Sequence, residues 1–360
     1  MKSFLIFSFF ILFFSSLVIN CNHTERKVNQ LEKEYNDINS ISYQDKDFVS
    51  STKNDNRDKN RYSDILAIEK TRVKLKVGDG LRSDYINANY VLDNKYILTQ
   101  GPLSHTIKDF WRMTWEQDSN LIVMLTNIVE NGMKKCDQYW PKLDDTIKYD
   151  LFIVKNVKEE NIDNIFIKRE FLVQNTKTNE NRIIYQLHYI AWPDHGVPSS
   201  FKEFISFVNH LDNITNTGPI IVHCSAGIGR SGTLCVIKHI MDELKNGASV
   251  NTLSIKNVVL NMRKERIGVV QTFGQYEFCF NVIDQVVKSS IKEQQKQKDQ
   301  QQQQQQKQEQ QPQEPSTKTT TLDESQDVVV DSQTTAVPTS YFITFGTLIV
   351  AIGLYLRLYK

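Results

Sequence analysis

Ile220-Ile-Val-His-Cys-Ser-Ala-Gly-Ile-Gly-Arg-Ser-Gly-Thr233 contains three successive elements from which the rest of the interpretation follows. The stretch opens with a continuous apolar run, Ile220–Val222, which is typical of a strand buried on both faces of a sheet. Small residues come next. An apolar segment from Ser231 to Lys245 then stops at Gly247, a residue type that commonly ends helices. The stretch therefore predicts a buried strand, a tight loop and a helix.

The loop has the composition of an anion-binding site. Residues 225–227 and 229 include serine, alanine and glycine, and side chains this small let backbone N–H groups turn inward. The positive end of the following helix dipole points to the same place, and the guanidinium of Arg230 matches phosphate oxygens. Cys224 stands where the strand meets the loop, and its thiolate is the nucleophilic form. The pattern predicts a phosphate-binding loop with Cys224 as nucleophile, although a lone cysteine before a helix would more often be structural.

Further strands and helices are predicted on both sides of this stretch. Short apolar runs rich in β-branched and aromatic residues cover Tyr96–Gln100, Leu121–Leu125 and Ile183–Ile190. In the last run, alternate residues are apolar, as in a half-buried strand. Ser200 and Glu203 form a capping box before a helical apolar pattern. Strands mixed with helices in this way predict an α+β fold, a single domain with a central twisted mixed sheet flanked by helices.

Composition excludes several classes of protein. The 360 residues include 43 Lys and Arg and 42 Asp and Glu, so the net charge of +1 argues against a nucleic-acid-binding protein. The five cysteines are too few for a disulfide scaffold. They form no Cys-x-x-Cys pair, so neither a metal site nor a cofactor is predicted.

The two ends of the chain differ from its middle. Apolar, uncharged segments lie near both termini, and a glutamine-rich stretch that is typical of a disordered linker precedes the second. The N-terminal segment is either a cleaved signal or a membrane anchor. We therefore expect the following organisation: 1–20 signal peptide or membrane anchor, 21–40 polar tether, with a leading helix as the alternative, 41–288 catalytic domain, 289–339 disordered linker and 340–356 transmembrane segment.

The middle of the chain resembles the protein tyrosine phosphatases. The match at 220–233 is close to the signature of that family, and seven further motifs follow the family order. They are Lys59-Asn-Arg-Tyr62, Asp84-Tyr-Ile-Asn-Ala-Asn89, Thr99-Gln-Gly-Pro102, Phe110-Trp-Arg-Met113, Gln138-Tyr-Trp-Pro141, Trp192-Pro-Asp-His-Gly-Val-Pro198, and Gln271-Thr272 with Gln275-Tyr276. Phe273 and Gly274 depart from the acidic residues common there.

The resemblance implies a role for each residue of the site. Cys224 would attack phosphorus, Arg230 and the backbone of residues 225–230 would bind the phosphate, and Asp194 would be the general acid and base. The residues implied to assist catalysis or to bind substrate are Ser231, Gln271, Gln275, Tyr62, Asp64, Ser225, Ala226, Gly227, Ile228 and Gly229. His223, Glu130 and Lys135 would support the loop. Several of these types also occur as ordinary surface or core residues.

Arg263, Arg266 and Gly268 match positions that can form a second anion site in the family. A solvated basic face is the interpretation that we favour for the two arginines.

The function implied is hydrolysis of phosphotyrosine on proteins. An inactive phosphotyrosine-binding module and a phosphatase of broader range are the alternatives, and the retained Cys224, Arg230 and Asp194 argue against the first. The expected partners are phosphotyrosyl proteins and, through the terminal apolar segments, a membrane. Thiolate chemistry favours a cytosolic catalytic domain, with a luminal or extracellular domain as the alternative.

Overall fold

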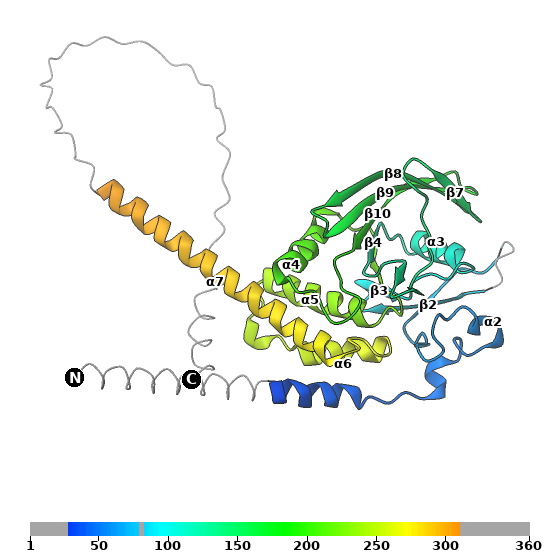
Figure 1. Ribbon diagram of the computed structural model, residues 1–360, viewed down its shortest axis with the longest axis horizontal. Coiled ribbons are helices and arrows are strands. Elements are labelled where there is room, and N and C mark those ends of the chain that lie inside the picture. The colour runs from blue at the N-terminus through cyan, green and yellow to red at the C-terminus, as the bar shows by residue number, and fades with distance from the viewer. Residues whose placement is uncertain (1–27, 79–82, 310–360) are drawn as a thin grey trace, which may run out of the picture. The chain divides into compact units, whose positions relative to one another are not determined.

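The computed structural model of the protein describes residues 28–78 and 83–309 (Figure 1). Within these residues, nine strands form one sheet in the order β1-β2-β3-β11-β4-β10-β9-β8-β7. They are β1 Arg72–Lys74, β2 Tyr85–Val91, β3 Tyr96–Thr99, β4 Leu121–Met124, β7 Thr146–Tyr149, β8 Phe152–Ile162, β9 Phe166–Asn175, β10 Asn181–Tyr189 and β11 Ile220–His223. A short hairpin, β5 Val129–Glu130 and β6 Met133–Lys134, stands apart. β3, β11, β4 and β10 are parallel neighbours, and antiparallel strands flank them. The predicted mixed sheet is confirmed.

The central strand β11 lies between β3 and β4, and all four of its residues are buried. Side chains alternate between the two faces of a strand. Ile221 joins the apolar core that contains Trp111 of helix α3, Ile107–Glu116. Helix α5, Gly229–Lys245, contacts β11 and β3. Helices cover both faces of the sheet at β11. This explains why residues 220–222 are continuously apolar, as predicted for a strand buried on both faces.

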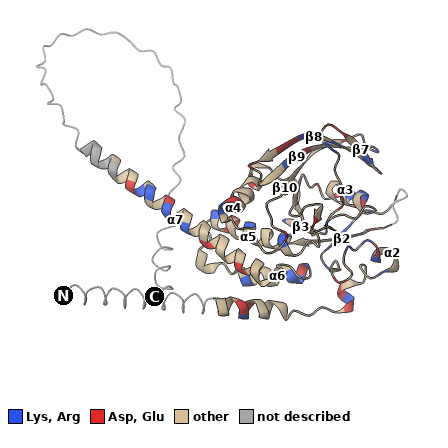
Figure 2. Ribbon diagram, in the orientation of Figure 1, with Lys and Arg blue, Asp and Glu red and all other residues tan. Residues whose placement is uncertain are grey.

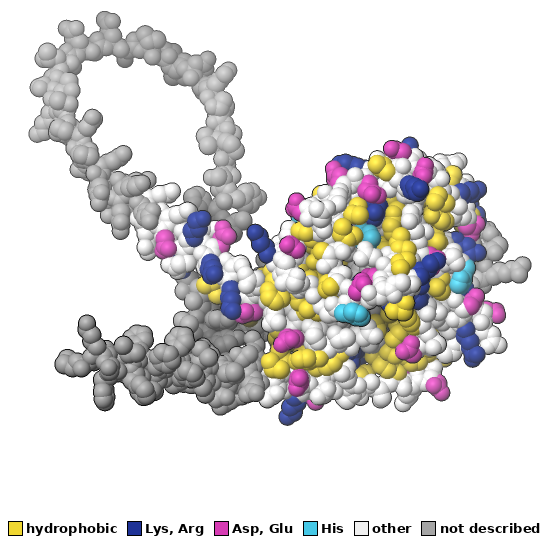
Figure 3. All heavy atoms as spheres, in the orientation of Figure 1, with side chains coloured by type: hydrophobic (Ala, Val, Ile, Leu, Met, Phe, Trp, Pro, Cys, Tyr) yellow, Lys and Arg dark blue, Asp and Glu magenta, His cyan; other side chains and the backbone are white. Residues whose placement is uncertain are grey.

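Four further helices with defined bounds lie in the described ranges, besides the helix of residues 28–39. They are α2 Asn54–Arg57, α4 Phe201–His210, α6 Ile255–Glu265 and α7 Phe273–Glu309, with short 3-10 helices at Asp45–Phe48, Leu211–Asn213 and Val250–Thr252. The Ser200 hydroxyl accepts a hydrogen bond from the Glu203 N–H at 3.2 Å, which confirms the predicted start of α4. Basic and acidic residues are interspersed along these elements (Figure 2). Apolar side chains reach the surface among charges of both signs on the face in Figure 3.

The burial of β10 differs from the prediction. Ile183 is 41% exposed, whereas Ile184 and Gln186, which should have faced away from the core, are buried together with Leu187 and Tyr189. The difference arises because both faces of β10 are covered: Ile184 joins the core that contains Trp111, and Tyr189 packs on Phe204 and Phe207. Toward its C-terminal end it is covered on both faces, and only its first residues lie at the surface.

The structure adds detail to two parts of the expected organisation. Residues 28–39, within the segment expected to be a polar tether or leading helix, form a helix that buries Leu31, Tyr35 and Ile38 at helical spacing. α7 continues to Glu309, so the first part of the predicted linker 289–339 is helical. The chain divides into two compact units at Val286 and Val287, and the sheet belongs to the first.

Both predicted membrane segments, 1–20 and 340–356, lie outside the described residues. Among the helices of residues 28–78 and 83–309, none combines the length and the apolar character that a membrane span requires.

Candidate active site

The chain turns from β11 into α5 through residues 224–228. Gly227 has a φ of 70°, and a Cβ atom built there would lie 2.0 Å from the carbonyl oxygen of Thr99. Only glycine fits this position. The backbone N–H of Gly227 donates a hydrogen bond to the sulfur of Cys224 at 3.3 Å, and Cys224 is 5% exposed. The strand, loop and helix predicted from the sequence thus bring the inward-turned N–H of Gly227 to the cysteine sulfur.

Arg230 is held by a buried carboxylate. Its two terminal nitrogens donate to the two carboxylate oxygens of Glu130 at 2.6 and 2.9 Å. Glu130 also accepts hydrogen bonds from the Thr126 hydroxyl and the Asn127 N–H. Burial opposes ionisation of Glu130, but these hydrogen bonds outweigh it and hold the pKa of the carboxyl below its usual range. The guanidinium is therefore fixed in orientation before any ligand arrives.

A cavity of about 410 Å³ opens above the loop. Its lining brings together twelve of the residues predicted to form the site, from five separate parts of the sequence. They are Tyr62, Asp64, Glu130, Lys135, Asp194, Cys224, Ser225, Ala226, Gly229, Arg230, Gln271 and Gln275. Gly227, Ile228, His223 and Ser231 do not line the cavity and are buried behind it.

Asp194 lies on an exposed loop at the rim. Gly196 has a φ of 81°, and its carbonyl accepts a hydrogen bond from the Trp192 indole N–H at 3.1 Å. Arg230 donates to the carbonyl of Pro193 at 3.3 Å. The loop is thus anchored at Trp192, which is 3% exposed, and contacts Arg230 beside Asp194.

Both predicted glutamines face the loop. A Cβ atom at position 229, where the chain has glycine, would lie 3.0 Å from the side-chain amide of Gln275 and 3.2 Å from that of Gln271. The Gln275 side chain also accepts a hydrogen bond from the Gln271 backbone N–H at 3.0 Å. Two neutral hydrogen-bonding groups therefore stand directly over the start of α5.

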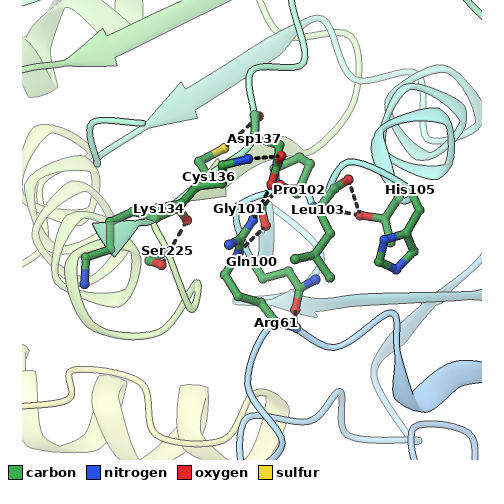
Figure 4. A network of polar contacts seen from close by, with 12 residues as sticks. Arg61, Gln100, Gly101, Pro102, Leu103, His105, Lys134, Cys136, Asp137 and Ser225 are labelled. Carbon is green, nitrogen blue, oxygen red and sulfur yellow. Dashed lines mark hydrogen bonds and ion pairs between the residues drawn. The ribbon is translucent and has the colours of Figure 1, made fainter. Parts of the chain in front are cut away.

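Tyr62 reaches the loop from the far N-terminal part of the domain. Its hydroxyl and that of Ser225 are 2.8 Å apart, and the Ser225 hydroxyl donates to the Lys135 carbonyl at 2.9 Å. The neighbouring Arg61 is anchored by polar contacts of its own (Figure 4). It donates to the carbonyls of Gly101 and Pro102 and pairs with Asp137 at 3.2 Å.

Two supporting residues lie under the loop. His223 is fully buried between the Tyr139 hydroxyl, 2.9 Å from Nε2, and the Cys224 carbonyl, 3.2 Å from Nδ1. Burial lowers the pKa of His223 to about 3, so the ring is neutral at physiological pH. The buried hydroxyl of Ser231 has no hydrogen-bond partner within the described part of the chain.

The solvated basic face predicted at Arg263 and Arg266 is wrong. Arg266 is fully buried and donates to the carbonyls of Gly227 at 2.7 Å and Ala226 at 3.0 Å, as well as to Asn87 and Asn89 of β2. Burial lowers the pKa of Arg266 to about 10. Arg266 therefore supports the outer side of the loop through its carbonyl groups. The charged residues before it, Lys264 and Glu265, made a surface position look more probable from the sequence.

The described ranges contain no group of three or more His, Cys, Asp or Glu side chains placed to hold a metal ion.

Comparisons with known proteins agree with this geometry. The family model described as protein-tyrosine phosphatase matches residues 56–285. The chain is 48% identical over 221 residues to tyrosine-protein phosphatase 2 of Dictyostelium discoideum, covering 59% of this chain and 58% of that protein. It is 36% identical over 283 residues to the mouse tyrosine-protein phosphatase non-receptor type 20, covering 76% of this chain and 64% of that protein. The chain thus spans about three fifths of the length of these relatives.

A solved structure shares the fold. The catalytic domain of human protein tyrosine phosphatase non-receptor type 18 superposes with a TM-score of 0.67 at 35% identity. The match covers 73% of this chain and 98% of that domain. On its fold, its site and these matches, the chain belongs to the protein-tyrosine phosphatase family.

Proposed function

We propose that the protein hydrolyses phosphotyrosine on proteins through a phosphocysteine intermediate, without a metal or other cofactor. One observation carries the proposal: Cys224, Arg230 and Asp194 line one cavity at the end of the parallel strands. A nucleophile, a bidentate phosphate ligand and an exposed acid are what displacement at phosphorus needs.

In the first step, the Cys224 thiolate attacks phosphorus and the bond to the tyrosyl oxygen breaks. Arg230, already oriented by Glu130, and the N–H groups of residues 225–230 neutralise the phosphoryl oxygens. Asp194 gives its proton to the departing oxygen, so the product leaves as neutral tyrosine. His223 and Arg266 keep the loop carbonyls turned away from the phosphate.

In the second step, water attacks the phosphocysteine. Its oxygen bonds to phosphorus, its proton passes to the Asp194 carboxylate, and the sulfur leaves as thiolate. Gln271 and Gln275 would orient this water, because both amides lie over Gly229 and carry no repulsive charge. The unpartnered hydroxyl of Ser231 would hydrogen-bond to the departing sulfur.

Tyr62 gives the cavity its selectivity in this proposal. The Tyr62 hydroxyl contacts Ser225 of the loop, so the Tyr62 ring would form one wall of the cavity. A phosphotyrosyl ring could stack against this wall while the phosphate of the substrate reaches the loop. Phosphoserine is too short to do both. Asp64, also in the lining, would accept hydrogen bonds from the substrate backbone, and Lys135 lies beside the phosphate.

The test compares phosphotyrosyl and phosphoseryl peptides of the same sequence. We expect turnover of the first only, and Tyr62→Ala should lower kcat/KM for it about tenfold through lost stacking. Peptide binding without turnover would instead indicate a binding module, and equal turnover of both peptides would indicate a phosphatase of broader range.

We further propose that the terminal apolar segments attach the protein to a membrane with the catalytic domain in the cytosol. The sequence supports attachment, and the four described cysteines, all free thiols, support a reducing compartment. Protease treatment of sealed membranes tests the orientation. Digestion of the catalytic domain without detergent would support the cytosolic placement, and survival until detergent is added would place the domain in a lumen.

A further inference from the structure

Val270, the residue before Gln271, has a backbone conformation that its side chain disfavours. Its φ is 57°, in the left-handed region, which is a genuine outlier for a β-branched residue. Such a conformation persists only where the surrounding structure enforces it. What enforces it also sets the direction in which Gln271 leaves the backbone.

Arg263 of α6 supplies the strongest contacts to this backbone. Its Nε donates to the Val269 carbonyl at 2.8 Å, and one terminal nitrogen donates to the Val270 carbonyl at 2.9 Å. Arg263 is 6% exposed, so these charged hydrogen bonds are shielded from water. The opposite side is fixed as well, because the Val270 N–H donates to the Ile228 carbonyl at 3.1 Å.

The helix of residues 28–39 covers this arginine. The other terminal nitrogen of Arg263 donates to the Ile38 carbonyl at 3.1 Å and to the Asn39 side chain at 2.7 Å. The Tyr35 ring lies 5.7 Å from the guanidinium, and the Tyr35 hydroxyl donates to the same Val270 carbonyl at 3.4 Å. The helix therefore shields the Arg263 guanidinium from water, and its Tyr35 hydroxyl adds a second hydrogen-bond donor to the Val270 carbonyl.

We propose that Arg263 and Tyr35 are positioning residues for the second step of catalysis. They hold the Val269–Val270 backbone so that the Gln271 amide stays over the loop, where it orients the attacking water. The inference rests on the proposed two-step function. It gives the N-terminal helix a part in turnover, although the helix lines none of the cavity.

The proposal predicts a distinctive kinetic pattern. The first step releases the phenol and does not need the water, so loss of positioning should spare kcat/KM, which reports only the steps up to that release. Breakdown of the phosphocysteine becomes slower. Both kcat and KM then fall by the same factor, and the initial burst rises toward one phenol per active site.

Arg263→Lys is the main test, because lysine keeps the charge but cannot serve both carbonyls at once. With a phosphorylated aryl substrate in stopped flow, we expect kcat to fall about tenfold at unchanged kcat/KM. The matched control is Arg112→Lys. Arg112 is another buried arginine, and it donates a hydrogen bond of 2.6 Å to the Ser83 carbonyl. It does not line the cavity. The control should lower stability and leave the burst amplitude unchanged.

Tyr35→Phe serves if the lysine variant does not fold, since it removes one hydroxyl and keeps the ring. It should lower kcat about twofold, with KM falling in proportion. Equal losses of kcat and kcat/KM in either variant, with the burst unchanged, would overturn the inference and leave the proposed function intact. A wild-type protein that shows neither burst nor turnover would overturn both.

Discussion

Three acids line the cavity: Glu130 is buried and paired with Arg230, whereas Asp64 and Asp194 are exposed. Asp194 follows Pro193, whose carbonyl accepts a hydrogen bond from Arg230, so in the proposed mechanism it is the acid that moves the proton. We expect Asp194→Asn to lower kcat for phosphotyrosyl peptides about a hundredfold. The loss should shrink as the substrate's phenol becomes more acidic, because a good leaving group needs no proton. A plot of rate against the phenol's acidity measures this.

Asp64→Asn is the control, the same chemical change in the same cavity. We expect it to raise KM for peptides and leave the dependence on the leaving group as in the wild type. An Asp194→Asn variant with the same loss on every leaving group would show that another residue supplies the proton.

The strand, loop and helix around Cys224 work as one element, and Gly227 is its tightest point. An alanine Cβ there would meet the Thr99 carbonyl at 2.0 Å, in a backbone conformation that already disfavours side chains. We expect Gly227→Ala to lower the free energy of unfolding by about 3 kcal/mol and to abolish turnover, since the loop N–H groups must shift. Denaturant unfolding and kinetics check the two effects.

Gly274→Ala provides a matched control in helix α7, where a Cβ would meet no atom within 4 Å. Alanine favours helix over glycine by about 1 kcal/mol, so this variant should be neutral or more stable. Gly227→Ala at wild-type stability and activity would contradict the geometry described for the loop.

For the whole molecule, stability should fall steeply in mild acid. Burial lowers the pKa of His223 to about 3 and that of His188 to about 4, below the ordinary value of 6.5. At a pH between the ordinary value and these lowered pKa values, the two histidines bind protons in the unfolded chain but not in the folded protein. The free energy of unfolding therefore falls as the pH falls through this range. Each histidine should cost about 2 kcal/mol between pH 8 and pH 5. Denaturant unfolding at several pH values measures the slope.

His223→Gln should lose about half of this slope, even if it is less stable at every pH. His188→Gln should lose the other half. Slopes that match the wild type in both variants would show that these rings do not stay neutral in the folded protein.

The extent to which the sequence predicted the structure depended on the distance between partners along the chain. Cys224, Arg230 and the small residues between them are contiguous, so spacing and composition sufficed. The burial of Arg266 depends on Asn87 and on loop carbonyls about 40 residues away, and nothing in its charged neighbourhood indicated it. Tyr62 entered only through the family resemblance, because its partner Ser225 lies far along the chain.

The sequence of residues 28–39 contains the apolar spacing of a helix, but its polar composition pointed more strongly to a tether. Leu31, Tyr35 and Ile38 have helical spacing, and all three are buried. The polar composition around them favoured a tether. Three apolar residues suffice here because Arg263 and Tyr276 supply polar partners for the same helix.

If the proposed mechanism holds, Cys224 becomes phosphorylated during turnover, and rapid quenching can trap this intermediate. The protein is mixed with a phosphotyrosyl peptide, quenched in acid within milliseconds, digested and analysed by mass spectrometry. We expect a phosphate on the sulfur of Cys224 and on no other residue, and none in Cys224→Ser. Turnover without phosphate on Cys224, or phosphate on another side chain, would contradict the mechanism.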